Sequence, residues 1–318
     1  MYPIKLNPIF KEIVWGGERL KNDYGYESDL KNIAEAWVLS ARNDGDNTVK
    51  NGVYANKSFT ELIKNNPEFL GEKGKKYNEF PLLIKFIDAK SDLSIQVHPD
   101  DDYARVHENS LGKTEAWYVL DCADDAELIY GFNKEITKEE FENSIKDNSF
   151  LNHVNKVKVK KGDIFFIEAG TLHAIGGGIL LAEVQQNCNT TYRVYDYGRL
   201  VDGKPRELHI EKALDVTNTL PPVRSAEAEG KEEVIGDAKI QKLCSCEFFT
   251  MTSLKLNGKY ECNCDNSSFL SVLILDGNGS ITVDNKAVSV KKGDSIFIPA
   301  NSGTVLLSGK FNALLSTL

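Results

Sequence analysis

Alternating apolar and polar residues predict two short strands in the first half of the chain. Over residues 93–98, leucine, isoleucine and valine alternate with serine, glutamine and histidine. Residues 113–118 repeat the alternation, with Lys113, Glu115 and Trp117 on one side. Because successive side chains of a strand point to opposite faces, each segment presents polar groups on one face of a sheet. The His-Pro-Asp-Asp-Asp run between them breaks the first strand, since proline cannot continue the ladder, and a short polar helix is expected after it.

Similar patterns predict further strands and a few helices. The apolar run PLLIKFID, residues 81–88, is short enough for a buried strand, and Lys85 is an unexpected charge inside it. Ser58 and Thr137 are capping residues, and Thr137 has a glutamate three positions later, as in a capping box. Helices are therefore predicted within 58–70, 135–150 and 207–216.

Composition narrows the class of protein. The 318 residues are 41% hydrophobic and 27% charged, which is ordinary for a globular protein of two domains or one elaborated barrel. The net charge of −9 argues against a nucleic-acid partner and against a basic membrane-binding surface. No signal peptide and no transmembrane run is evident, so a cytoplasmic protein is expected.

The six cysteines give no clear site. Cys244 and Cys246, like Cys262 and Cys264, are spaced to share one face of a strand. Disulfides are disfavoured in a reducing cytosol. Zinc sites usually space their cysteines two to four residues apart, so metal binding by this set is not expected.

The polar faces of the two strands suggest a metal site. Gln96, His98 and Glu115 would offer an amide, an imidazole and a carboxylate from one side of a sheet. The fourth ligand is best sought in residues 158–178, where His173 opens a strand after a Glu-Ala-Gly turn. A set with one carboxylate leaves a bound divalent ion with net positive charge, which suits Lewis-acid polarisation of an oxygen.

The spacing Gly-x5-Glu-x-Gly-x2-His around His173 resembles the second motif of the cupin superfamily, which is a small antiparallel barrel with ligands on its inner wall. Gln96 stands where the first cupin motif normally has a histidine. More of the chain resembles the short form of the type I phosphomannose isomerases, and the similarity covers nearly its whole length. The segments that carry it are WGG at 15–17, EAWVLS at 35–40, QVHPDD at 96–101, LGKTEAWYVL at 111–120 and TTYRVYDYGR at 190–199.

This resemblance implies one Zn²⁺ per chain, although manganese, cobalt or iron would also accept these ligands. It also implies that Arg193 is the catalytic arginine. Lys113 is predicted to be the general base, because a lysine desolvated beside a cation loses its proton more readily. Asn189 replaces an aspartate of the longer enzymes, so a carboxylate base at that position is not expected. Weaker candidates for substrate binding are Lys85, Ser94 and Arg199.

A weak internal repeat indicates two related barrels. VKKGDIFFIEAGTLHA at 159–174 aligns with VKKGDSIFIPANSGTV at 290–305, where Thr304 takes the place of His173. Since cupins often occur in pairs, the second copy is expected to be degenerate and to bind no metal.

The predicted fold is therefore mainly β, a bicupin of two antiparallel β-barrel or jelly-roll domains with a few inserted helices. Residues 1–235 would form the catalytic barrel, with the strand-like segment 1–57 as its outer layer and 217–235 as a linker. Residues 236–318 would form the degenerate barrel.

The predicted activity is the interconversion of mannose 6-phosphate and fructose 6-phosphate by a metal-dependent isomerase, through a cis-enediol. A small sugar phosphate is then the partner, and positive charge must be concentrated locally to bind it. Two alternatives are another metal-dependent cupin enzyme, such as an oxidoreductase, and a non-catalytic sugar-phosphate-binding cupin.

Overall fold

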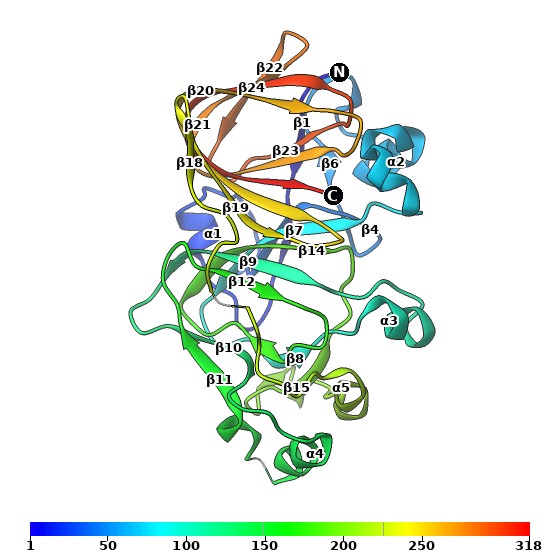
Figure 1. Cartoon of the computed structure of the whole chain (residues 1–318), viewed down its shortest axis with the longest axis vertical. Helices are drawn as coiled ribbons and strands as arrows, with labels where there is room; N and C mark the ends of the chain where they lie inside the picture. The colour runs from blue at the N-terminus through cyan, green and yellow to red at the C-terminus, as the bar shows by residue number, and fades with distance from the viewer. Residues whose placement is uncertain (148, 225) are drawn as a thin grey trace.

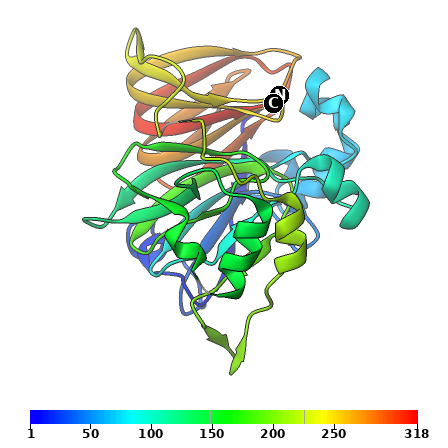
Figure 2. The same ribbon diagram turned by 60° about the horizontal axis from the view of Figure 1, so that its bottom comes forward.

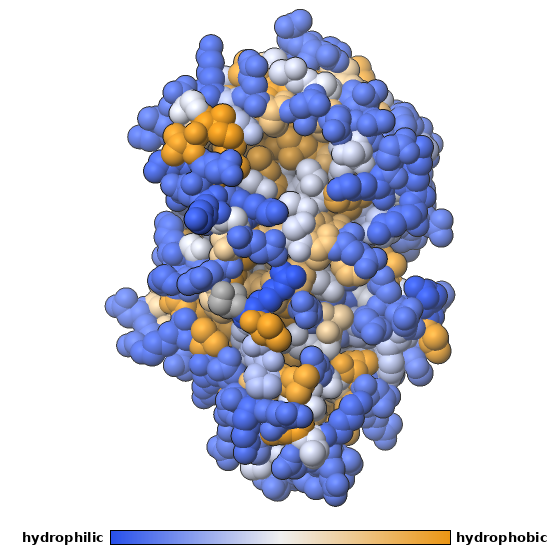
Figure 3. All heavy atoms as spheres, viewed as in Figure 1, coloured by the Kyte–Doolittle hydropathy of each residue, from blue (hydrophilic) through white to orange (hydrophobic). Residues whose placement is uncertain are grey.

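The chain forms a mainly antiparallel β structure, as predicted (Figure 1). The structure is a computed structural model and describes residues 1–147, 149–224 and 226–318. Three large sheets account for most of the described strands, and the helices are short. The face seen in Figure 3 is mostly hydrophilic with scattered apolar side chains. No helix among the described residues is both long and apolar enough to cross a membrane.

The strands pair in the following orders. The six-stranded sheet has the order β12 (Ile164–Ile167), β9 (Glu115–Cys122), β14 (Ile179–Gln186), β7 (Leu82–Ala89), β3 (Glu35–Leu39), β2 (Ile9–Lys11). The five-stranded sheet has the order β11 (Val154–Lys158), β10 (Glu127–Phe132), β13 (His173–Ala174), β8 (Ile95–Val97), β15 (Tyr192–Tyr195). The nine-stranded sheet has the order β18 (Glu233–Ile235), β19 (Ala238–Ser245), β20 (Thr250–Cys264), β24 (Gly303–Thr317), β21 (Leu270–Val283), β23 (Ser295–Ile298), β1 (Ile4–Asn7), β6 (Thr48–Val49), and β22 (Lys286–Lys291) pairs with β21.

Two small hairpins and the helices complete the described structure. The hairpins pair β4 (Ala41–Arg42) with β5 (Gly45–Asp46), and β16 (Leu200–Val201) with β17 (Lys204–Pro205). The α-helices are α1 (Arg19–Asn22), α2 (Phe59–Asn65), α3 (Asp101–His107), α4 (Lys138–Lys146) and α5 (Ile210–Val216). Short 3₁₀ turns occur at Gly52–Tyr54, Pro67–Leu70, Glu72–Lys76 and Phe150–Asn152.

Local sequence signals predicted α2 and α4, whereas α1 was not predicted. Ser58 caps α2 by accepting from the backbone N–H of Glu61, and Thr137 and Glu140 form a reciprocal capping box at α4. The predicted helix at 207–216 begins only at Ile210.

The six-stranded sheet is the central layer, and both of its faces are buried. One face packs against the five-stranded sheet through a core that includes Trp117, Phe165 and Tyr130. The other face packs against the nine-stranded sheet through residues such as Phe86 and Phe297. This double burial explains why β7 and β14 read as near-continuous apolar runs. Helices α4 and α5 cover the outer face of the five-stranded sheet (Figure 2).

The two copies of the repeat adopt the same turn. In each copy the aspartate side chain accepts a hydrogen bond from the backbone N–H of the first of the two lysines. Asp163 accepts from Lys160 at 3.0 Å, and Asp294 accepts from Lys291 at 2.7 Å. The glycine between them has a positive φ in both, 93° and 87°, which L-residues with side chains rarely adopt. A four-residue buried strand follows each turn, β12 or β23.

The N-terminal segment is divided between two sheets. Strands β2 and β3 join the six-stranded sheet, but β1 pairs with β23, and β6 pairs with β1. Strands β1 and β6 therefore do not follow the prediction that residues 1–57 contribute an outer layer to the first barrel, because they join the nine-stranded sheet. The predicted linker 217–235 also ends in a strand, β18, which pairs with β19. A domain division at residue 235 stays a prediction.

Candidate metal centre and active site

The cavity between the five- and six-stranded sheets brings most of the predicted site residues together. Its volume is about 140 Å³. The predicted residues in its wall are Lys85, Ser94, Gln96, Lys113, Glu115, His173 and Arg193. His98 lies directly behind this wall, with Nε2 3.7 Å from Glu115 Oε2. Arg199 does not belong to the wall.

Strand pairing explains the convergence. In the five-stranded sheet Gln96 is the direct partner of His173 on one side and of Arg193 on the other. Glu115 begins β9 in the facing sheet, so its carboxylate reaches the group from the opposite wall. Two sheets whose polar faces meet thus supply the predicted ligands from both sides.

The ligand atoms lie close together and are buried. His98, Glu115 and His173 are each 1% exposed, and one ligand atom from each lies within 4.8 Å of the others. His173 Nε2 is 3.4 Å from Glu115 Oε1 and also 3.4 Å from the Gln96 side-chain amide. This is the one group of three or more His, Cys, Asp or Glu side chains in the described part of the chain that is suited to a metal.

The hydrogen bonds of both imidazoles leave a nitrogen free for a cation. Nδ1 of His98 donates to the Thr190 carbonyl and Nδ1 of His173 donates to the Thr171 carbonyl, each at 2.8 Å. The Nε2 lone pairs then face the cavity, the arrangement common for histidine ligands. Burial lowers the pKa of His173 to about 4, and that of His98 well below its usual value, so both rings are neutral at neutral pH.

Two buried polar atoms of this group, His98 Nε2 and Glu115 Oε2, make no hydrogen bond in the structure. The Lys113 ammonium lies 2.9 Å from Glu115 Oε2 and forms an ion pair with it. Buried groups without hydrogen bonds are costly and call for an explanation such as a bound ion. A divalent cation would satisfy both atoms, so the residues present fit the metal that the sequence predicts.

A network of buried charges lies next to the ligands. Lys113 Nζ is 2.9 Å from Glu115 Oε2 and 3.8 Å from Glu183 Oε1. Lys85 Nζ lies 3.2 Å from the same oxygen of Glu183 and 3.7 Å from Glu35. Burial raises the pKa of the Glu183 carboxyl, and the nearby negative charge of Glu115 raises it further. The cavity therefore holds a chain of proton-carrying side chains beside the ligands.

Glu183 was not predicted from the sequence as a site residue. It interrupts the apolar run ILLAEVQQ as Lys85 interrupts PLLIKFID, and the two residues are direct partners on β14 and β7. The sequence signal that could have identified this pair is the presence of two isolated charges of opposite sign, each within an apolar run. Glu35, the first residue of the EAWVLS segment, accepts a hydrogen bond from the Trp37 indole at 2.7 Å.

Arg193 lies at the other side of the ligands. Its Nε donates to the Ser94 hydroxyl at 3.3 Å, and Nη1 donates to the Glu207 carbonyl at 2.7 Å. The Ser94 hydroxyl in turn donates to Gln96 Oε1 at 3.3 Å. Arg199 is bound instead to Asp196 and to the Asp92 carbonyl.

The loop before Glu115 is fixed by a second set of contacts. Asp101 Oδ1 accepts from the backbone N–H of Gly112 at 2.7 Å and from the Gln186 amide at 3.0 Å. Gln186 Oε1 accepts from the N–H of Thr114 at 2.9 Å. These bonds flank Lys113 on both sides, so Asp101 and Gln186 position the lysine.

We expect Asp101→Ala to lower kcat by about 10- to 100-fold, the effect typical of losing a group that orients site residues. Steady-state kinetics and bound-metal content would be measured together. The control is Asp102→Ala, whose side chain on the same helix is 92% exposed. An Asp101→Ala enzyme with the kcat of the control would contradict the positioning role.

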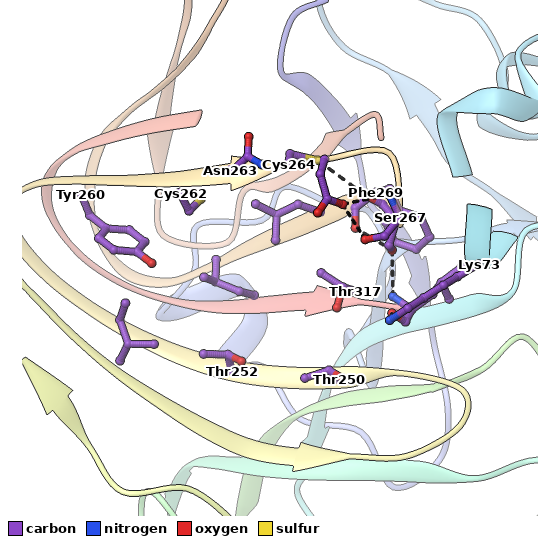
Figure 4. A pocket seen from close by; sticks show the side chains of 16 residues that line it. Lys73, Thr250, Thr252, Tyr260, Cys262, Asn263, Cys264, Ser267, Phe269 and Thr317 are labelled. Atoms are coloured by element: carbon purple, nitrogen blue, oxygen red, sulfur yellow. Dashed lines mark hydrogen bonds between the residues drawn. The ribbon is translucent and has the colours of Figure 1, made fainter. Parts of the chain in front are cut away.

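A larger cavity of about 310 Å³ lies in the nine-stranded sheet and contains none of the predicted residues (Figure 4). Hydroxyl groups of Thr250, Thr252 and Tyr260 line it together with Cys262 and Cys264. All six cysteines are free. Thr304, which replaces the motif histidine, is exposed on β24.

The fold and the site define a β-barrel protein of the cupin type with a buried centre suited to a divalent metal ion. Residues 4–129 match the catalytic domain of type I phosphomannose isomerases, and residues 239–318 match the mannose-6-phosphate isomerase cupin domain. The chain belongs to the mannose-6-phosphate isomerase family.

Relatives support this placement over the full length. The chain is 40% identical to the probable mannose-6-phosphate isomerase GmuF and 39% identical to the mannose-6-phosphate isomerase ManA, both of Bacillus subtilis. Each alignment covers 99% of both chains. The crystal structure of the mannose 6-phosphate isomerase from Bacillus subtilis superimposes with a TM-score of 0.93, at 37% identity, over 100% of both chains.

Proposed function

We propose that the protein is a metal-dependent aldose–ketose isomerase that interconverts mannose 6-phosphate and fructose 6-phosphate. The observation that carries this proposal is the convergence of Gln96, His98, Glu115 and His173 with Lys113 and Arg193 around one buried cavity. Full-length relatives named as mannose-6-phosphate isomerases support the same activity. An oxidoreductase or a non-catalytic binding protein has no comparable support.

We propose Zn²⁺ as the resident ion, held by Gln96, His98, Glu115 and His173. Nitrogen and oxygen ligands of this kind suit zinc, and the neutral imidazoles present free Nε2 lone pairs. When bound, the ion would supply Lewis-acid polarisation of the sugar's carbonyl or hydroxyl oxygen.

The protein's own groups would move the proton. Lys113 takes the proton from C2 of the open-chain aldose and returns one at C1 of the cis-enediol, and the hydroxyl proton of O2 is transferred to O1 in the same conversion. Glu115 and Glu183, at 2.9 and 3.8 Å from its amine, stabilise the ammonium form that exists between the two transfers. Arg193 donates hydrogen bonds to the negative charge that develops on the sugar oxygens.

The remaining predicted contacts differ in their support. Ser94 lies between Gln96 and Arg193, where it would bind a sugar hydroxyl. Lys85 would act through Glu183, to which it is bound. Arg199 stays a predicted substrate residue, although Asp196 holds its guanidinium. We also propose a cytoplasmic location, because the full-length relatives are named as isomerases of a phosphorylated sugar.

The function is tested by a coupled assay of the purified protein with mannose 6-phosphate, before and after chelation. We expect turnover that is lost on removal of the metal and restored by adding Zn²⁺. Mannose without the phosphate and glucose 6-phosphate serve as substrate controls. A protein that carries metal but never converts mannose 6-phosphate would contradict the proposal.

A further inference from the structure

Three arginines lie within residues 193–206, a stretch that begins in the candidate active site. Arg193 lies on β15, Arg199 precedes the β16–β17 hairpin, and Arg206 follows it. This hairpin projects from the body of the molecule in Figure 2. All three guanidinium groups are partly buried. Arg199 and Arg206 bind one carboxylate and Arg193 lies near it. This local positive charge contrasts with the net charge of −9 of the whole chain.

Asp196 is the carboxylate that holds two of them. It is 6% exposed, and Arg206 Nε donates to its Oδ2 at 2.7 Å while Arg199 binds its Oδ1. Burial opposes ionisation of this acid, but the bonds from Arg206 and Arg199 keep its pKa below the usual value. One negative charge therefore stands against three positive charges. The nearby Glu207 carboxylate is 82% exposed and so contributes little.

Only two of the three arginines reach the cavity. Arg193 and Arg206 form part of its wall together with Asn189 and Thr191. Arg199 is turned to the Asp92 carbonyl and acts as a support for Asp196. The excess positive charge is thus presented to the cavity by Arg193 and Arg206.

A chain of contacts gives the order of groups along the cavity. The ligand Gln96 contacts Ser94, Ser94 contacts Arg193, and Arg193 binds the carbonyl of Glu207, the neighbour of Arg206. Along this chain of contacts, Arg206 comes after Ser94 and Arg193 when counted from the ligand Gln96. A hexose phosphate reacts at one end of its open chain and carries its charge at the other.

We propose that Arg206 is the anchor of the phosphoryl group, with Arg193 beside it, so that the reacting carbons face the ligands. The inference rests on the proposed function, because it assumes a phosphorylated sugar in this cavity. A planar guanidinium matches two phosphoryl oxygens at once, and Asp196 holds Arg206 in place before the substrate arrives. Arg206 then determines the preference for phosphorylated over free sugars.

The test compares Arg206→Gln with Lys204→Gln, which removes an exposed charge from the same hairpin. We expect Arg206→Gln to raise KM for mannose 6-phosphate and the inhibition constant of inorganic phosphate, each by about 10- to 100-fold, with kcat within a few-fold of the parent. Lys204→Gln should change neither constant appreciably. Unchanged constants in Arg206→Gln, or a larger effect in Arg199→Gln, would overturn the assignment.

A measurement on the unmodified protein covers the case in which Arg206→Gln does not fold. Arginine residues are labelled with phenylglyoxal in the presence and absence of inorganic phosphate, and peptides are mapped by mass spectrometry. Phosphate should protect Arg206. Equal labelling of Arg206 with and without saturating phosphate would overturn the proposal, whereas the failure of the proposed function would instead show as a lack of turnover in the parent protein.

Discussion

Replacing Lys113 by methionine should lower kcat by about two to four decades, the usual range for losing a general base, while KM stays nearly constant. Methionine keeps much of the side-chain volume but cannot carry a proton. Steady-state kinetics with mannose 6-phosphate would measure the effect. Lys90→Met is the control, because Lys90 is exposed just beyond the end of β7.

Hydrogen exchange separates the base from a group that merely binds. In the parent enzyme the C2 hydrogen of the substrate should exchange with solvent deuterium whenever the enediol forms. Lys113→Met should abolish this exchange together with turnover. If exchange continues at the parent rate, Lys113 is not the base. Loss of exchange in Glu183→Gln but not in Lys113→Met would transfer the role to Glu183, whose Oε1 lies 3.8 Å from the lysine.

Replacing His173 by alanine should remove most of the bound metal and lower kcat by roughly three decades or more. A Lewis acid contributes several kcal/mol to the transition state, and about 1.4 kcal/mol is a factor of ten. His173 is 1% exposed and presents Nε2 to Glu115, so alanine removes one of the four proposed ligands from a buried site. Elemental analysis and kinetics on the same preparation would measure both effects.

The control for this variant is His107→Ala, an exposed histidine that stacks on Tyr103 and lies outside the cavity wall. It should retain a full equivalent of metal. Thermal unfolding of both variants distinguishes loss of the ligand from loss of the fold. A folded His173→Ala protein that keeps a full equivalent of metal would place the metal site elsewhere.

Local sequence patterns were sufficient to predict the strands that carry the proposed ligands. The two-residue period fixes which face a side chain occupies, so Gln96 and the residues around Glu115 could be assigned to polar faces before any pairing was known. Capping residues such as Thr137 act within one turn of helix, and α4 was accordingly predicted from sequence.

Contacts set by distant pairing could not be predicted in this way. Glu183 meets Lys85 because β14 lies beside β7, and nothing in either apolar run states that the two are partners. Arg206 reaches the cavity because a bond to Asp196 orients it after a hairpin of two-residue strands. Periodicity indicates which face of a strand a side chain occupies, but not which other strand pairs with it.

The pairing of β1 with β23 has a consequence for synthesis on the ribosome. Ile4 faces Phe297, and Lys5 also binds Asp294 at 2.5 Å, so β1 requires residues of β23 that are made much later. Contacts of such long sequence separation form late, after a large loss of chain entropy. The nascent β1 must therefore remain without its final partner until β23 has been translated. During that interval its exposed strand edge is open to chaperones and to aggregation.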